Sequence, residues 1–159
     1  MQRITHDSFV IERTYQAPPA QVFAAWADPA IKARWFIGPE GWTAIRRELD
    51  FRIGGEEVLH GRIKATETLY EARYYEIVAA ERIVFVYDMH LSGKHHSVSL
   101  ASVEFASMAG GTKLLFTEAV ALLDGTPSAE ARKNGTGTHL DRIAQLLERS
   151  TTSRACVNA

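Results

Sequence analysis

Hydrophobic and polar residues alternate along the middle of the chain, whereas apolar residues follow a helical spacing near both of its ends. Residues 8–16 (SFVIERTYQ) alternate in part and are rich in branched and aromatic residues, which predicts a first strand. Two short helices are expected to follow this strand. Pro19 suits the first turn of one helix, and Asp28 and Pro29 suit the cap and first turn of the other.

Between residues 42 and 122 the pattern predicts about six consecutive strands. Gly54–Gly55, Ser92–Gly93 and Gly110–Gly111 mark tight turns between them. Because such short connections leave no room for a crossover, neighbouring strands are expected to pair antiparallel.

A helix is expected after the strands, because apolar residues recur there at positions i, i+3, i+4 and i+7: Leu140, Ile143, Ala144 and Leu147. Thr126 and Pro127 offer a cap and a first turn. Two glycines weaken the segment that follows, so we expect the helix itself to begin near Thr136. Residues 151–159 are polar and predict a frayed tail.

This order of elements predicts one α+β domain over residues 1–150, with a curved antiparallel sheet and one long helix. The helix is the only long element able to cover a face of the sheet. Because a helix rarely fills the whole concave side of a curved sheet, we expect an apolar cavity between the two.

Strand parity selects the side chains that would face this cavity. Two strands have a clear parity, and their inward residues are Ile83, Phe85, Tyr87 and Met89 on one and Leu114, Phe116 and Glu118 on the other. Strand 69–78 is ambiguous between the set Tyr70, Ala72, Tyr74 and the set Tyr75, Ile77, unless a bulge reconciles them. In strand 96–105 the set Ser97 to Phe105 is attractive, but a two-residue turn at Ser92–Gly93 would point the even-numbered residues inward.

Glu118 is the polar group that we expect inside, where an unpartnered carboxylate would be costly. One interpretation is a carboxylate that polarises a ligand or acts as a general base, together with a tyrosine such as Tyr74 or Tyr87. The other is a structural bond to an arginine, a tyrosine hydroxyl or a backbone group at a strand end. The pattern of residues leaves both open.

Composition excludes several classes of function. The chain has 159 residues and a net charge of −1, which lacks the basic surplus needed to bind nucleic acid. The absence of an 18-residue apolar run and of a signal-like start predicts a cytoplasmic protein without membrane contact. His90, His95 and His96 surround a hairpin tip with Asp88, where a metal site would lack supporting groups, so no metal is expected. The glycine pairs are hairpin turns and Cys156 lies in the polar tail, so no cofactor or nucleophile is expected either.

Six stretches of the chain together resemble the START-like (SRPBCC, Bet v 1-like) superfamily of helix-grip proteins: APPAQVFAAWADPAIKARWF, ELDFRIGGEE, YYEIVAAERIVFVYDMHLSGK, SVSLASVEF, GGTKLLFTE and GTGTHLDRIAQLLE. Within it, the chain is similar to the family named after the activator of Hsp90 ATPase homologue 1, over about residues 8–149. The resemblance implies a seven-stranded curved sheet that grips a long C-terminal helix around a hydrophobic tunnel. It also implies an apolar small-molecule ligand, because the wider superfamily binds lipids, sterols and polyketides, and some members are cyclases or dehydratases.

We therefore expect a binding protein for an apolar small molecule, with an enzyme (a cyclase, dehydratase or hydrolase using Glu118) and a chaperone- or stress-linked adaptor as alternatives. A homodimer is possible. The residues expected to contact the ligand are Trp35, Trp42, Tyr74, Phe85, Tyr87, Met89, Phe116, Glu118, Leu140 and Ile143.

The stretch WFIGPEGW (residues 35–42) combines two of the three tryptophans with helix-breaking residues. Trp35 is expected to anchor the second short helix to the core. Trp42 is expected at the mouth of the tunnel, where the neighbouring glycines would let the segment bend as a gate.

Overall fold

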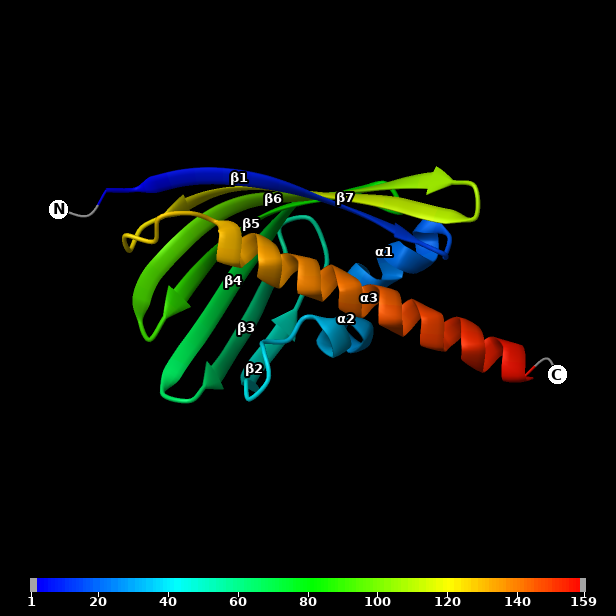
Figure 1. The fold of residues 1–159 in the computed structure, drawn as a ribbon, viewed down its shortest axis with the longest axis horizontal. Coiled ribbons are helices and arrows are strands. Elements are labelled where there is room, and N and C mark those ends of the chain that lie inside the picture. Colours follow the sequence, from blue (N-terminus) through cyan, green and yellow to red (C-terminus); the bar gives the residue numbers. More distant parts are fainter. Residues whose placement is uncertain (1–2, 158–159) are drawn as a thin grey trace.

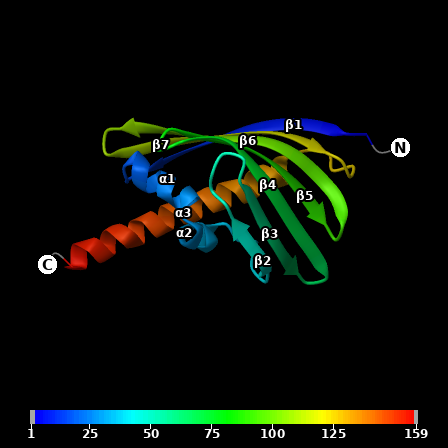
Figure 2. The same ribbon diagram turned by 180° about the vertical axis from the view of Figure 1, so that it is seen from behind.

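The computed structural model describes residues 3–157, and over that range the chain forms a seven-stranded antiparallel sheet and three helices (Figure 1). The elements in chain order are β1 (Thr5–Tyr15), α1 (Pro19–Ala27), α2 (Pro29–Trp35), β2 (Thr43–Leu49), β3 (Glu56–Ile63), β4 (Thr66–Val78), β5 (Arg82–Leu91), β6 (Lys94–Met108), β7 (Gly111–Leu122) and α3 (Glu130–Val157). Figures 1 and 2 show α3 lying across the concave side of the curved sheet. The predicted helix-grip arrangement is thereby confirmed.

The strand order is β1-β7-β6-β5-β4-β3-β2. Each strand from β2 to β7 pairs with its neighbour in sequence, as the short turns predicted. β1 is the exception, because it pairs with β7 in a continuous antiparallel register that places Phe9 opposite Glu118. This pairing puts the first strand beside the last one and leaves β2 as the other edge of the sheet.

The two short helices follow the predicted capping chemistry. Asp28 ends α1 and begins α2, and its Oδ1 accepts hydrogen bonds from the backbone N–H of Ala30 at 2.8 Å and of Ile31 at 3.3 Å. These bonds satisfy donors that the first turn of a helix leaves unpaired. Trp35 then anchors α2, because its side chain is almost fully buried and its Nε1 donates to the Ala25 carbonyl of α1 at 2.8 Å.

Two bulges decide the strand faces that the sequence left open. In β4 the register shifts at Tyr75, which is exposed, so Tyr74 and Ile77 both reach the inner side. In the β5–β6 hairpin the two-residue turn is present, but the register shifts between Met89 and His90. The extra residue in β6 restores the odd-numbered set to the inner face, and Ser97, Ser99, Ala101, Val103 and Phe105 are all buried.

The start of α3 differs from the expected one. The helix begins at Glu130, before the expected start at Thr136, and Thr126 donates to Asp124 in the preceding loop instead of capping it. A Cβ on Gly137 would lie 3.2 Å from the Arg13 guanidinium of β1, a contact slightly closer than usual. The missing side chain lets the helix pack closely on β1. The helix also continues to Val157, through most of the segment expected to be a frayed tail.

The core lies between the concave face and the helices, and it includes the inward residues predicted for β5 and β7: Ile83, Phe85, Tyr87, Leu114 and Phe116. Glu118 is fully buried among them. Within residues 3–157, none of the helices is both long enough and apolar enough to cross a membrane.

Candidate functional site

A cavity of about 680 Å³ lies between the concave face of the sheet, α3 and the segment after α2. Its exposed wall residues mark the opening, and they include Pro39, Thr66, Ser128 and Gly135. The wall is mainly aromatic and aliphatic. Seven of the residues predicted from the sequence contribute to it: Trp35, Trp42, Phe85, Tyr87, Met89, Phe116 and Leu140.

Three predicted residues, Tyr74, Glu118 and Ile143, are fully or almost fully buried but do not contribute to the cavity wall. Each points toward the core, as its position in a strand or helix predicted for Glu118 and Ile143, whereas the sequence left the face of Tyr74 open. Other side chains stand between them and the open volume. Their direct contact with a ligand remains a prediction.

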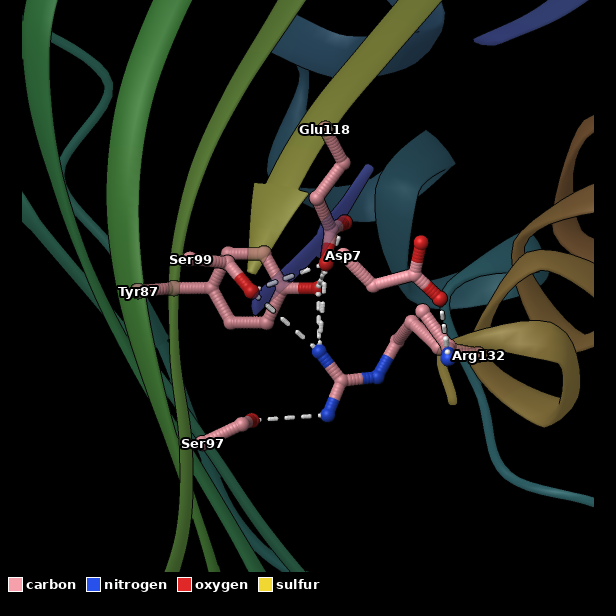
Figure 3. Close-up of polar contacts among 7 residues, drawn as sticks. Asp7, Tyr87, Ser97, Ser99, Glu118 and Arg132 are labelled. Atoms are coloured by element: carbon pink, nitrogen blue, oxygen red, sulfur yellow. Dashed lines mark hydrogen bonds and ion pairs between the residues drawn. The ribbon is translucent and has the colours of Figure 1, made fainter. Parts of the chain in front are cut away.

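Glu118 lies in a buried polar cluster with Tyr87, Ser99, Arg132 and Ser97 (Figure 3). The Tyr87 hydroxyl donates to the Glu118 carboxylate, with distances of 2.7 and 2.8 Å to its two oxygens. Ser99 Oγ donates to the same carboxylate at 2.8 Å. Burial and the neighbouring carboxylate raise the pKa of Tyr87, so this hydroxyl keeps its proton.

Arg132 completes the cluster from the first turn of α3. Its Nη1 lies 3.2 Å from Glu118 Oε2 and also donates to the Tyr87 hydroxyl at 3.0 Å. Its Nη2 donates to Ser97 Oγ at 2.7 Å. Burial opposes the guanidinium charge, but Tyr87 and Glu118 more than offset it and raise the pKa of Arg132. Arg132 lines the cavity wall, so Glu118 holds a permanently charged guanidinium at the edge of the cavity.

A second buried cluster joins α2 to the sheet. Lys32 Nζ donates to Glu57 Oε1 at 2.6 Å and to the Tyr74 hydroxyl at 3.1 Å, and Tyr74 donates to the same Glu57 oxygen at 2.8 Å. Burial lowers the pKa of Lys32, although Glu57 opposes the effect. Its ammonium lies 5.1 to 5.8 Å from the centroids of four aromatic rings: Trp26, Trp35, Phe36 and Tyr74.

The segment after α2 is held by α3 through one carbonyl oxygen. His139 Nε2 donates to the Ile37 carbonyl at 2.9 Å, and Arg142 Nη1 donates to the same oxygen at 3.0 Å. Burial lowers the pKa of His139 to about 4, so the imidazole is neutral at pH 7. Both side chains also line the cavity.

Trp42 lies in a slot made by two glycines at the cavity wall. A Cβ on Gly61 would fall 2.2 Å from the indole, and a Cβ on Gly38 would fall 2.3 Å from it. The indole Nε1 donates to Thr68 Oγ1 of β4 at 3.0 Å. Trp42 is thus fastened to the sheet by shape and by one hydrogen bond, and its role as a gate remains a prediction.

Lys32 and Arg132 are the site residues that sequence reasoning missed, although helical spacing contained a signal for both. Lys32 precedes Trp35 by three residues, which places it on the apolar face of α2. Arg132 precedes Leu140 by two turns and shares its face of α3. It was overlooked because the helix was expected to begin after it.

The histidines at the β5–β6 hairpin do not gather into a metal site: among the side chains that the structure describes, residues 3–150, no group of three or more potential metal ligands is found. His90 and His95 stack across the two strands with ring centroids 4.4 Å apart. His96 instead bonds to Asp124 in the loop before α3. The Thr126 hydroxyl, which donates to the same carboxylate, and the bond to His96 hold the pKa of Asp124 well below its usual range.

Comparison with known proteins identifies a matching family and solved structures with the same fold. A family model described as activator of Hsp90 ATPase homolog 1-like protein matches residues 16–148. An uncharacterised protein from Rhizobium leguminosarum is 40% identical with a TM-score of 0.87, over 94% of this chain and 99% of that one. The Mll3558 protein from Rhizobium loti is 37% identical with a TM-score of 0.84, over 91% and 99%.

DynU16, encoded in the dynemicin biosynthetic locus, shares the fold at 17% identity and a TM-score of 0.64, over 89% of this chain and 47% of that one. Comparison with curated proteins gives no match. The family model covers most of the chain, in agreement with the six motifs recognised in the sequence. The chain belongs to the family of activator of Hsp90 ATPase homolog 1-like proteins.

Proposed function

We propose that this protein binds a small molecule with a large apolar body in the cavity between the sheet and α3. The observation that carries the proposal is the cavity itself, whose volume of about 680 Å³ lies within the range of small-molecule sites, about 300 to 1,000 Å³. Its wall is predominantly apolar and has a small number of polar groups. Such a composition suits burial of an apolar ligand with one or two oriented polar atoms.

The packing around the cavity supports a preformed site. Trp26 and Trp35 pack edge to face with centroids 4.7 Å apart, and Phe36 packs in the same way on Tyr70 at 4.8 Å. Such contacts stabilise large side chains in fixed positions. A rigid wall loses little conformational freedom when a ligand enters, which favours affinity.

The arrangement of Glu118 favours binding over the enzymatic alternative. Its carboxylate already accepts hydrogen bonds from Tyr87, Ser99 and Arg132, and it does not contribute to the cavity wall. A general base must reach the proton that it removes, directly or through one water molecule. The geometry instead suits the structural role, in which Glu118 positions Arg132.

The adaptor alternative has no comparable support. Within residues 3–150, the large apolar residues that are exposed lie on the sheet and its connections: Ile4, Val10, Ile45, Ile53, Tyr75, Leu100 and Met108. Singly exposed apolar residues are common on monomeric proteins. A homodimer and a cytoplasmic location remain predictions from the sequence.

The proposal is tested by obstructing the opening of the cavity from α3. Gly135 lies at this opening, and a Cβ there would meet no atom within 4 Å, so Gly135→Leu adds a bulky side chain without a clash. We expect at least a tenfold loss of affinity for 1-pyrenebutanol, a neutral fluorescent probe. Stability should hold or rise, because leucine is the better helix former by about 0.8 kcal/mol.

Lys133→Leu is the matched control, because it adds the same side chain to an exposed position of α3 that does not line the cavity. It should leave the probe affinity unchanged. Equal affinities of the parent protein and Gly135→Leu, or no binding of the probe to the parent protein, would refute the proposal.

A further inference from the structure

The charged side chains of the cavity wall all have one sign. Lys32, Arg132 and Arg142 contribute to the wall, whereas no aspartate or glutamate among the described residues does. The two carboxylates that balance Lys32 and Arg132 are Glu57 and Glu118, both buried outside the wall. Each carboxylate stabilises a cation whose side chain reaches the cavity, so the wall presents donors without acidic acceptors.

Arg132 retains donors that the protein does not use. A guanidinium has five N–H groups, and the partners of Arg132 take those of Nη1 and one of Nη2: Tyr87, Ser99, Glu118 and Ser97. Figure 3 shows these partners gathered along one edge of the guanidinium. Nε–H and the second Nη2–H have no partner among the described residues.

The unused N–H groups form the other edge of the guanidinium plane, where Nε and Nη2 lie side by side. Two parallel N–H groups at this spacing match the two oxygens of a carboxylate. A lysine ammonium at the same place would offer a charge without this fork.

Trp26 lies beside these cations in the cavity wall and is 4% exposed. Its indole N–H has no hydrogen-bond partner among the described side chains, but the nitrogen is itself fully buried and does not open onto the cavity. The preference for a ligand with acceptor oxygens over a hydrocarbon or a cationic ligand therefore rests on the cations of the wall: Lys32, Arg132 and Arg142.

We propose that the ligand is a carboxylic acid with a large apolar body, and that Arg132 binds its carboxylate through Nε–H and Nη2–H. This inference rests on the proposed function, because it assigns the polar end of the molecule that the cavity holds. Glu118, Tyr87, Ser99 and Ser97 act as positioning residues, since they fix the guanidinium plane from its other edge.

The test compares two probes that differ only at the head group, 1-pyrenebutanoate and 1-pyrenebutanol, in fluorescence titrations at pH 7. The carboxylate should bind at least about tenfold more tightly than the alcohol, a difference of about 1.4 kcal/mol. The double variant Arg132→Gln/Glu118→Gln removes the fork without leaving a buried charge unpaired. It should bring the two affinities within about twofold.

Two further variants keep the test decisive if the double variant folds poorly. Glu118→Gln removes the buried counterion and keeps the fork, so the preference for the carboxylate should increase. Lys133→Gln removes the same charge as Arg132→Gln from the exposed side of α3 and should leave the preference unchanged.

Binding of the alcohol without a preference for the carboxylate would overturn the inference and leave the proposed function standing. Binding of neither probe would overturn both. A preference that survives in a folded Arg132→Gln/Glu118→Gln protein would also overturn the inference, because it would assign recognition to a cation other than Arg132.

Discussion

Lys32→Met breaks a buried ion pair while it keeps most of the volume of the side chain. Lys32 Nζ and Glu57 Oε1 are 2.6 Å apart, and the two side chains are only 4% and 3% exposed. After the substitution, the Tyr74 hydroxyl is the one hydrogen-bond donor that the described residues still offer to Glu57. An uncompensated buried charge of this kind costs about 3–5 kcal/mol, a large part of the total stability of most domains.

The chain offers a matched control on its surface. Lys113 Nζ lies 2.8 Å from Glu12 Oε1, nearly the same distance, but the side chains are 52% and 54% exposed. Solvent screens such pairs, so we expect Lys113→Met to cost less than about 1 kcal/mol. Burial is then the main variable that separates the two substitutions.

The double variant Lys32→Met/Glu57→Gln separates charge from packing. The introduced amide oxygen would still accept from Tyr74 but would carry no charge, so the double variant should regain most of the stability lost by Lys32→Met. Urea unfolding, followed by tryptophan fluorescence, measures the free energy of unfolding of each variant. The values are comparable when the slope of this free energy against urea concentration is the same for all variants. If Lys32→Met costs no more than Lys113→Met, or if the double variant is no more stable than the single one, the reasoning from the buried charge is wrong.

Trp42→Ala should lower the affinity for 1-pyrenebutanol at least tenfold and lower the free energy of unfolding by a smaller amount, because the half-buried indole lines the cavity. If the substitution lowers the free energy of unfolding by more than it lowers the free energy of binding, Trp42 is an ordinary core residue. His139 has a pKa of about 4 in the folded chain against an ordinary 6.5, so the unfolded chain takes up its proton first as the pH falls. The contribution of neutral His139 to the free energy of unfolding is fully present above pH 6.5 and decreases by about 3 kcal/mol as the pH falls to 4. His139→Gln should flatten this part of the curve of unfolding free energy against pH, and an unchanged curve would contradict the assignment.

Regular strands made much of the fold predictable. In β5 and β7 the alternation is uninterrupted across the residues that face the helix, so parity alone placed Phe85, Tyr87, Phe116 and Glu118 on the inner side correctly. Parity failed to decide β4 and β6, because a bulge inserts one residue and exchanges the faces that follow it. The bulges depend on how both partner strands fit, which a single strand sequence does not contain.

The sequence predicted which side chains of the candidate site point inward, but not which of them reach the cavity. Parity shows that Glu118 points inward, but whether such a residue reaches open volume depends on side chains from other elements, such as Arg132. Lys32 was missed because a charged residue in a helix is normally assigned to the solvent side, and Arg132 because the helix was expected to begin after it. Their buried carboxylate partners lie on distant strands, and only the folded sheet brings them together.

The pairing of β1 with β7 has a consequence for the order in which this chain can fold. Every other pair of neighbouring strands is a local hairpin that closes a short loop, whereas Thr5 pairs with Leu122 and Tyr15 with Thr112. Closing a long loop costs more entropy and slows folding. During synthesis, β1 leaves the ribosome first but must wait for β7, with Phe9 and Ile11 uncovered in the meantime. The earliest strand to be made is therefore the last that can join the sheet, and the delay is a window for aggregation.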